Sequence, residues 1–271
     1  MKKKNKKIYF LVEARVNSSR LKNKVLKKIN KNHLTIDYVI KNILSSGILK
    51  DKIIVLTPKN KINSKLQKHV KKKYGCKIFK GSASNVFKRV YDCCNSFNIS
   101  HFARITADNI FLDPIFIKRT TNLFLLDKSS YLSSRTMDHS KRWKEKSDYN
   151  EGTSIEFLNL NFFKKIKNLV NKSNQEYPTW NIFSNPQKFK LKKIDLIKEY
   201  KGLDIKKIRT TLDTKKDLKF LRSVSKKLNL VPGKNNLLKI LKNQHIFALN
   251  KINQKVHKKI AYKIVQKSQK K

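Results

Sequence analysis

Short apolar runs alternate with amphipathic segments through the first half of the chain, and this alternation is the feature that most constrains the fold. Ile8–Val12 is followed by the amphipathic run Leu34–Leu44, and Lys52–Leu56 is followed by Leu66–Tyr74. Strands that alternate with helices are typical of parallel β units with right-handed crossovers. The sequence therefore predicts an α/β fold.

The alternation continues beyond these segments and then becomes less regular. We expect strands at Lys77–Lys80 and Phe102–Ile105, a helix from Gly81-Ser82 to about Ser96, and a helix that starts at Asp113-Pro114. Asp at the N-cap and Pro at the first helical position favour such a start. Further strands are expected at Ser130–Ser133, Ser154–Leu158, Phe189–Ile197 and Ile208–Leu212, and helices at Asn161–Val170 and from Thr214 to about Leu228. The polar segment Arg135–Glu151 is predicted to be a mobile flap over a site.

The domain organisation follows from a break near residue 232. Val231-Pro232-Gly233 interrupts the pattern, and the chain from Asn235 onward is helical in pattern and basic. No internal repeat or low-complexity linker is found. We predict one catalytic-type domain over residues 8–230 and a basic helical C-terminal extension over residues 231–271.

A basic loop links the first predicted strand to the first predicted helix. Arg15, Arg20 and Lys24 supply three positive charges, and Ser18 and Ser19 supply hydroxyl donors. Phosphate-bearing ligands bind at the carboxyl ends of strands in open α/β sheets. The loop is thus a candidate triphosphate cradle, although a solvated connection in a lysine-rich chain is an equally simple interpretation.

The scarcity of arginine favours the cradle. Only nine of the 65 basic residues are arginines, and two of the nine lie in this loop. Arginine supplies planar, bidentate donors that lysine lacks, and phosphate and carboxylate recognition needs them. A retained arginine in a lysine-rich chain therefore indicates anion recognition.

The formal net charge of +47 would ordinarily suggest nucleic acid or an anionic membrane surface as the partner. Lysine is, however, spread along the whole chain instead of being gathered in one patch. No stretch approaches the roughly 20 apolar residues that a membrane span requires. We therefore expect no specific nucleic-acid site and no membrane insertion. The three cysteines have no metal-ligand spacing and favour a reducing cytoplasm.

Two aspartates directly follow predicted strands. Asp108 follows Phe102–Ile105, and Asp213 follows Ile208–Leu212. Two carboxylates at the same edge of a sheet could share a Mg²⁺ that also contacts nucleotide phosphates. The alternatives are a loop turn for Asp108 and an N-cap for Asp213, and spacing alone favours them.

These pieces together resemble a known family. The run Ala14-Arg15-x-x-Ser18-x-Arg20-Leu21-x-x-Lys24-x-Leu26 is similar to the N-terminal signature of the cytidylyltransferases of spore-coat polysaccharide biosynthesis, which are relatives of the CMP-sialic acid and CMP-KDO synthetases. The similarity continues, in order, through Gly81-Ser82, Arg104–Asp108, Asp113-Pro114, Gly152–Phe157, Asn185-Pro186-x-Lys188-Phe189-Lys190 and Arg209–Asp217. It covers about residues 8–230, and the C-terminal tail resembles that of the family too.

The resemblance implies a Rossmann-like, three-layer nucleotidyltransferase of the glycosyltransferase-A type that uses CTP and Mg²⁺ to make a CMP-sugar. It implies that Arg15 and Lys24 are catalytic residues that hold the triphosphate, together with Ser18 and Arg20. Further implied positions are Ala14 and Arg104 for the nucleotide, Glu156 and Glu176 for the sugar, and Asp108 and Asp213 for the metal. A homodimer in the cytoplasm is a further expectation.

Several residues depart from the family pattern. Asn17 stands where the family usually has Gly, Lys22-Asn23 where it has Pro-Gly, and Ser154 where it has Asp. Asn tolerates the left-handed backbone conformation that Gly adopts freely. The alternatives to a cytidylyltransferase are a sugar-nucleotide-dependent glycosyltransferase, a basic nucleic-acid-binding protein, and a paralogue that binds nucleotide without turnover.

Overall fold

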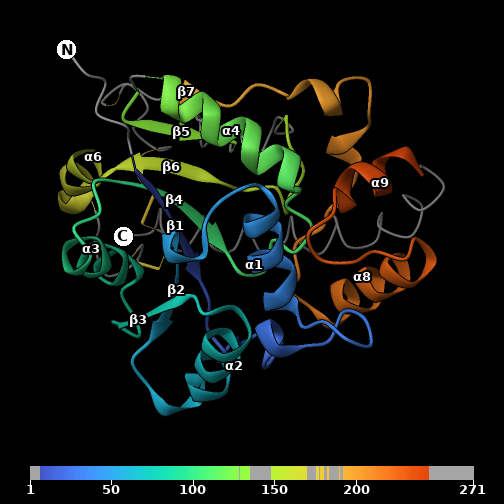
Figure 1. Ribbon diagram of the computed structural model, residues 1–271, viewed down its shortest axis with the longest axis horizontal. Coiled ribbons are helices and arrows are strands. Elements are labelled where there is room, and N and C mark those ends of the chain that lie inside the picture. The colour runs from blue at the N-terminus through green and yellow to red at the C-terminus, as the bar shows by residue number, and fades with distance from the viewer. Residues whose placement is uncertain are drawn as a thin grey trace, which may run out of the picture.

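The computed structural model describes residues 7–127, 129–134, 148–169, 175–176, 178–179, 182, 189 and 192–243. Within this part of the chain a seven-stranded sheet has the order β3-β2-β1-β4-β6-β5-β7 (Figure 1). The strands are β1 (Ile8–Glu13), β2 (Ile53–Pro58), β3 (Lys77–Gly81), β4 (His101–Thr106), β5 (Tyr131–Ser133), β6 (Glu156–Asn159) and β7 (Lys192–Lys193). The α/β fold predicted from the alternation is confirmed.

The sheet is mixed, because β6 runs antiparallel to both of its neighbours. The pairs β1·β2, β1·β4, β2·β3 and β5·β7 are parallel, whereas β6 pairs antiparallel with β4 and with β5. The amino end of β6 therefore lies beside the carboxyl end of β4. As a result Glu156, the first residue of β6, pairs in register with Arg104.

Helices cover both faces of the sheet, which gives the predicted three layers. One face carries α1 (Thr35–Ser45), α2 (Ser64–Tyr74), α4 (Pro114–Leu126), α8 (Lys215–Lys227) and α9 (Asn236–Lys242), and the other carries α3 (Val86–Ser96) and α6 (Leu160–Lys165) (Figure 1). Side chains alternate along β1, so Phe10 and Val12 pack into the first apolar core and Leu11 into the second. Short 3₁₀ helices complete the fold: η1 (Lys24–Leu26), η2 (Lys50–Lys52), η3 (Lys61–Asn63), η4 (Ile166–Leu169), η6 (Lys198–Tyr200) and η7 (Ile205–Lys207).

Several predicted elements differ in detail from the structure. Residues 208–212 do not form a strand; they make isolated bridges, Asn109 with Thr211 and Glu151 with Arg209. The strand predicted at Phe189–Ile197 is reduced, among the described residues, to Lys192–Lys193. The helix predicted at Asn161–Val170 is α6 followed by η4. In each case the apolar periodicity indicates that the residues are buried. A strand also needs a neighbouring strand to pair with, and a helix needs an uninterrupted series of main-chain hydrogen bonds.

The helix after β3 begins later than predicted. The N-cap of α3 is Asn85, whose side chain accepts a hydrogen bond from the Lys88 amide. At the other predicted cap, Thr214 and Asp217 form a reciprocal capping box at the start of α8. Asp213 is therefore not the N-cap of α8.

Helix α9 is tied to the body of the protein through Asp113. The buried Asp113 carboxylate accepts hydrogen bonds from the Leu237 and Leu238 amides of α9 and from the Tyr200 hydroxyl. Leu237 belongs to the same apolar core as β1. The division of the chain at residue 230 stays a prediction. Most of the predicted flap (135–147) and the C-terminal residues 244–271 lie outside the described residues.

Across the described ranges, no helix combines the length and the apolar character needed to cross a membrane.

Candidate active site

The basic loop after β1 is folded back on itself by main-chain hydrogen bonds. The Ala14 amide donates to the Leu56 carbonyl at 3.0 Å, and the Asn23 amide donates to the Val16 carbonyl at 3.1 Å. Asn23 has φ +57°, a left-handed conformation, at a position where the resembling family has Gly. Asn reaches this conformation at modest cost, so the loop closes here without the glycine. Ala14 and Ser18 are both buried in this loop.

Closure of the loop places Lys24 between the two predicted metal ligands. The Lys24 Nζ atom lies 2.5 Å from Asp108 Oδ2 and 3.1 Å from Asp213 Oδ1. The three side chains are 12%, 17% and 5% exposed, respectively. The structure therefore brings Asp108 and Asp213 within reach of one atom.

Two arginines add to this pair of carboxylates. Arg20 Nη2 donates to Asp213 Oδ1, and Arg209 Nη2 donates to Asp213 Oδ2, both at 2.8 Å. Within the described part of the chain, Asp213 forms ion pairs with Lys24, Arg20 and Arg209, and Asp108 forms an ion pair with Lys24. We use the name Lys24 cluster for the group formed by Lys24, Asp108, Asp213, Arg20 and Arg209.

Asp213 reaches the site by backbone pairing with the loop after β4. The Leu212 amide donates to the Asp108 carbonyl at 3.0 Å, next to the Asn109–Thr211 bridge. Asp108 itself lies in a turn closed by the Asn109 amide and the Thr106 carbonyl. The sequence pattern predicted a strand over Ile208–Leu212 that would carry Asp213. This expectation is wrong, because the pairing is local to the loop and does not extend as a ladder.

A glycine allows this close approach. Gly152 has φ +122°, and a Cβ atom there would lie 2.1 Å from Thr210 Oγ1. The neighbouring Glu151 accepts a hydrogen bond from Arg209 Nε at 2.8 Å. Gly152 therefore permits the contact that orients the Arg209 guanidinium toward Asp213.

A second group of charges lies at the same edge of the sheet, on the face covered by α3 and α6. Arg104 donates to Glu13 Oε1 at 2.5 Å through Nε, and its Nη1 atom pairs with Glu156. Glu156 also accepts hydrogen bonds from the Tyr131 hydroxyl at 2.8 Å and from the Thr179 hydroxyl at 2.7 Å. We call Glu13, Arg104 and Glu156 the Arg104 cluster.

The Arg104 cluster is almost fully enclosed. The side chains of Arg104, Glu156 and Glu13 are 4%, 2% and 9% exposed. Arg104 and Glu156, predicted to contact nucleotide and sugar, here contact each other. The roles predicted for them stay predictions.

Arg15 and Glu176 form an exposed ion pair across the site. Arg15 Nη2 lies 2.5 Å from Glu176 Oε1, and both side chains are more than 40% exposed. The preceding Gln175 carbonyl accepts hydrogen bonds from the Val86 and Phe87 amides at the start of α3. A residue predicted for the triphosphate and one predicted for the sugar are therefore neighbours.

Electrostatics favour the charged form of the central lysine. Burial opposes a charged side chain, but the Asp108 and Asp213 carboxylates outweigh this effect and raise the pKa of Lys24 above its ordinary value. Burial likewise opposes the charge of Arg209, whereas Asp217, Glu151 and Asp213 raise its pKa. Both cations are thus held charged by their carboxylate partners.

The donor set fits a hard divalent cation that is completed by other ligands. Among the described residues no group of three or more His, Cys, Asp or Glu side chains is placed to hold a metal ion. Asp108 and Asp213 supply two carboxylates, and Mg²⁺ is usually bound by one or two carboxylates together with substrate phosphates and water. The residues therefore fit a metal that binds together with a nucleotide.

Glu13 and Arg209 belong to these clusters, although neither was predicted from the sequence as a site residue. Arg209 is one of only nine arginines and stands four residues before Asp213, a signal that could have identified it. Glu13 ends β1 at its carboxyl edge. Its partner could not be identified without the register of the sheet.

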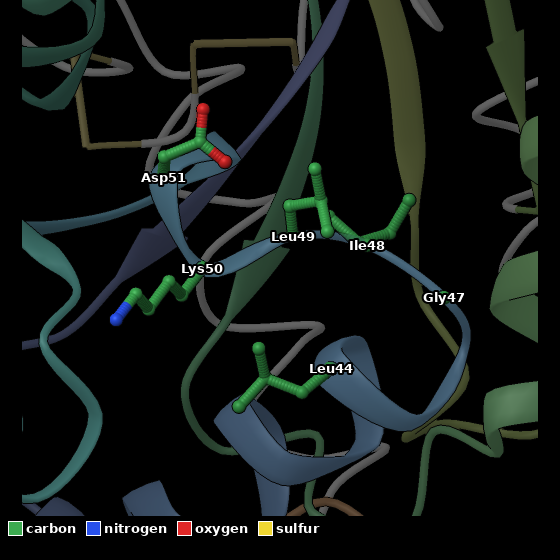
Figure 2. A pocket seen from close by; sticks show the side chains of 6 residues that line it. All are labelled: Leu44, Gly47, Ile48, Leu49, Lys50 and Asp51. Atoms are coloured by element: carbon green, nitrogen blue, oxygen red, sulfur yellow. The ribbon is translucent and has the colours of Figure 1, made fainter.

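The pocket in Figure 2 lies elsewhere. It is formed where α1 gives way to β2, at the amino end of that strand, and is lined by Leu44, Gly47, Ile48, Leu49, Lys50 and Asp51. None of the predicted site residues lines it. The pocket lies at the amino end of β2, whereas the Lys24 cluster lies at the carboxyl ends of the parallel strands. The pocket is therefore not part of the site.

Comparisons with known proteins agree with the resemblance noted in the sequence. Residues 9–142 match the cytidylyltransferase family model. The chain is 29% identical over 227 residues to an uncharacterised protein of Methanocaldococcus jannaschii, a match that covers 83% of this chain and 86% of that one. It is 24% identical to the spore coat polysaccharide biosynthesis protein SpsF of Bacillus subtilis, covering 81% and 87% of the two chains.

Solved structures show the same fold. A cytidylyltransferase from Leptospira borgpetersenii matches with a TM-score of 0.74 at 23% identity, over 89% of this chain and 96% of that chain. A CMP-KDO synthetase in complex with CTP matches with a TM-score of 0.57 at 10% identity, over 82% and 99%. The chain has the α/β nucleotidyltransferase fold, and its resemblance to the cytidylyltransferases of spore-coat polysaccharide biosynthesis is confirmed.

Proposed function

We propose that this protein transfers CMP from CTP to a hydroxyl group of a sugar, with Mg²⁺ as cofactor and pyrophosphate as the second product. The observation that carries the proposal is the Lys24 cluster, in which cations from the basic loop meet two carboxylates at the carboxyl edge of the sheet. The match to the cytidylyltransferase family supports CTP as the nucleotide.

The chain's own residues would act mainly by positioning and by charge. Arg15, Arg20 and Lys24 supply positive charge on the loop after β1, where the triphosphate would lie, with Ala14 and Ser18 in the same loop. Cations that face the leaving pyrophosphate stabilise the charge that develops on it, and positioning supplies much of the rate of phosphoryl-type transfer. Asp108 and Asp213 would hold the metal. When bound, Mg²⁺ would neutralise charge on the phosphate oxygens.

The sugar would be recognised on the other side of the loop. Glu176 pairs with Arg15 through an exposed contact, so a substrate group could replace that contact. Glu156 lies deeper, with its carboxylate engaged by Arg104, Tyr131 and Thr179. The side chains of Arg104 and Glu156 are 4% and 2% exposed and contact each other, so we assign Glu176 the more direct role. Surface polysaccharide or glycan synthesis in the cytoplasm, and a homodimer, are parts of the same proposal.

Thermal unfolding with each nucleotide tests the proposal. We expect CTP with Mg²⁺ to raise the melting temperature of the full chain more than ATP, GTP or UTP, because stabilisation grows with ligand concentration relative to Kd. Asp108→Asn is the matched variant and should lose the Mg²⁺-dependent part of the shift. Equal shifts with all four triphosphates would indicate generic anion binding by a basic surface. A larger shift with a nucleoside diphosphate sugar would indicate a glycosyltransferase.

The nucleic-acid alternative is tested by salt. We expect DNA or RNA to bind weakly, without sequence preference, and to lose affinity steeply as salt is raised, because counterion release drives such binding. Tight binding to one sequence at physiological salt would overturn the proposal.

A further inference from the structure

The Lys24 ammonium contacts both of the carboxylates that the proposed function assigns to a metal. We propose that Lys24 is an internal counter-ion that competes with a divalent cation for Asp108 and Asp213. The inference rests on the proposed function, because that function assigns the metal to these two side chains. Its test nevertheless needs no nucleotide.

Geometry makes the two cations alternatives. Lys24 Nζ is within hydrogen-bond distance of Asp108 Oδ2 and of Asp213 Oδ1. A divalent cation held by both carboxylates would compete with Lys24 for their negative charge, because Asp108 and Asp213 would be the ligands of both. An ammonium group and a divalent cation that share these carboxylates would repel each other strongly in a site with little solvent. Binding of the cation would therefore displace the Lys24 ammonium from the two carboxylates.

The rest of the cluster makes this exchange possible without exposing an unpaired charge. Arg20 and Arg209 each contact Asp213, so that carboxylate stays neutralised when Lys24 leaves. Asp108 has the more exposed side chain of the two carboxylates. Breaking a buried pair is costly when it leaves an isolated charge. Here Arg20 and Arg209 would stay paired with Asp213, and the incoming cation itself would pair with Asp108.

The released lysine would then be free to contact phosphate. Lysine is suited to such an exchange, because its ammonium group is a point charge on a flexible stem, with three donors that need no fixed plane. One side chain would thus neutralise the carboxylates in the absence of metal and become available to an anion when the metal is bound.

The experiment measures binding of Mn²⁺ alone to the full chain by isothermal titration calorimetry, without nucleotide. Lys24→Met should tighten Mn²⁺ binding at least about tenfold, a factor that corresponds to about 1.4 kcal/mol. Lys22→Met is the matched control, because it removes the same charge from an exposed position two residues away. We expect this control to stay within about twofold of the wild type. Lys24→Arg keeps the charge and should show no tenfold gain.

A double variant assigns the gain to the proposed ligands. Lys24→Met combined with Asp108→Asn should lose the gain, because one of the two carboxylates is then absent. Equal Mn²⁺ affinity in wild type and Lys24→Met would overturn the inference, as would an equal gain in Lys22→Met. If Lys24→Met is too unstable for titration, the rise in melting temperature per Mn²⁺ increment makes the same comparison. If CTP stabilises no better than other triphosphates while Lys24→Met still binds Mn²⁺ more tightly, the nucleotide assignment fails and the counter-ion role stands.

Discussion

The Lys24 cluster and the Arg104 cluster both lie at the carboxyl ends of central strands, but they differ in the cation at their centre. The ammonium of Lys24 bridges two carboxylates by single contacts and is 12% exposed. The guanidinium of Arg104 makes several contacts with Glu13 and Glu156 and is 4% exposed. Further hydrogen bonds from Tyr131 and Thr179 occupy the Glu156 carboxylate.

Because of this difference, the Lys24 ammonium is suited to exchanging its partners, whereas the Arg104 guanidinium is suited to fixing the residues around it. A planar guanidinium between two carboxylates is fixed by several parallel donors, whereas an ammonium group can leave one partner and keep another. Burial and the two glutamates act in opposite directions on Arg104, and the glutamates prevail and raise its pKa. We therefore expect the Lys24 cluster to govern binding and turnover and the Arg104 cluster to govern stability.

The largest effect is expected from Asp108→Asn. If Asp108 holds the catalytic metal, its loss should lower metal-dependent turnover at least about 10³-fold, since a bound metal supplies several kcal/mol of transition-state stabilisation. The free energy of unfolding of the ligand-free protein should change by less than about 2 kcal/mol, because Lys24 keeps its contact with Asp213. Pyrophosphate release and urea denaturation measure the two quantities. Turnover within tenfold of the wild type would remove Asp108 from the metal site.

Arg104→Met should show the opposite pattern, in which the main effect is on the free energy of unfolding and not on turnover. Its removal leaves the Glu13 and Glu156 carboxylates buried without their cation. Breaking such a group typically costs about 3–5 kcal/mol in the free energy of unfolding. Urea denaturation of Arg104→Met and Lys24→Met provides the comparison. If Lys24→Met were the more destabilised of the two, the division of roles between the clusters would be wrong.

Asp113 is a buried carboxylate outside both clusters, and the pH dependence of its contribution to stability extends the comparison. Burial raises the pKa of Asp113 to about 7, against about 3.9 for an unfolded chain, although hydrogen bonds from the Leu238 and Leu237 amides and from Tyr200 oppose this rise. Between these values the folded state holds a proton that the unfolded state has lost. The stabilisation of the folded state by this bound proton is fully present below about pH 4. It is lost as the pH rises through about 7, and the free energy of unfolding falls by up to about 1.4 kcal/mol per pH unit.

The measurement compares wild type with Asp113→Asn, which cannot titrate at this position. The difference in unfolding free energy between the two proteins should change with pH in this window, with the wild type losing stability relative to the variant as the pH rises. A difference that stays constant from pH 4 to 7 would show that Asp113 is ionised throughout.

The smallest effect on stability is expected for Arg15→Ala. Arg15 and Glu176 form a pair that is more than 40% exposed on both sides, and such pairs contribute about 0–1 kcal/mol. The free energy of unfolding should therefore hardly change, while CTP binding should weaken. Arg15→Lys should also bind more weakly if the guanidinium grips phosphate with two donors. Calorimetric titration with CTP checks both variants, and wild-type affinity in Arg15→Lys would reduce the residue to a general positive charge.

The sequence alone determined the class of fold and most elements of the first half of the chain. The strands β1 to β4 and the helices between them lie close to their predicted positions, because local periodicity and caps such as Thr214 and Asp217 act within a few residues. The ordered motifs also indicated the resemblance to the cytidylyltransferases. Asn23 adopts the left-handed conformation that Asn tolerates, which agrees with its standing where the resembling family has Gly.

Only the tertiary structure decided which charged residues contact each other. Lys24 contacts Asp108 and Asp213 across 84 and 189 residues of sequence. Glu156 meets Arg104 only because β6 runs antiparallel beside β4. Such contacts depend on strand order, direction and register, which hydrophobic patterning constrains only by face. The sequence could therefore propose charged residues for the site, but their division into an exchangeable lysine cluster and an enclosed arginine cluster follows from burial and pairing in the folded chain.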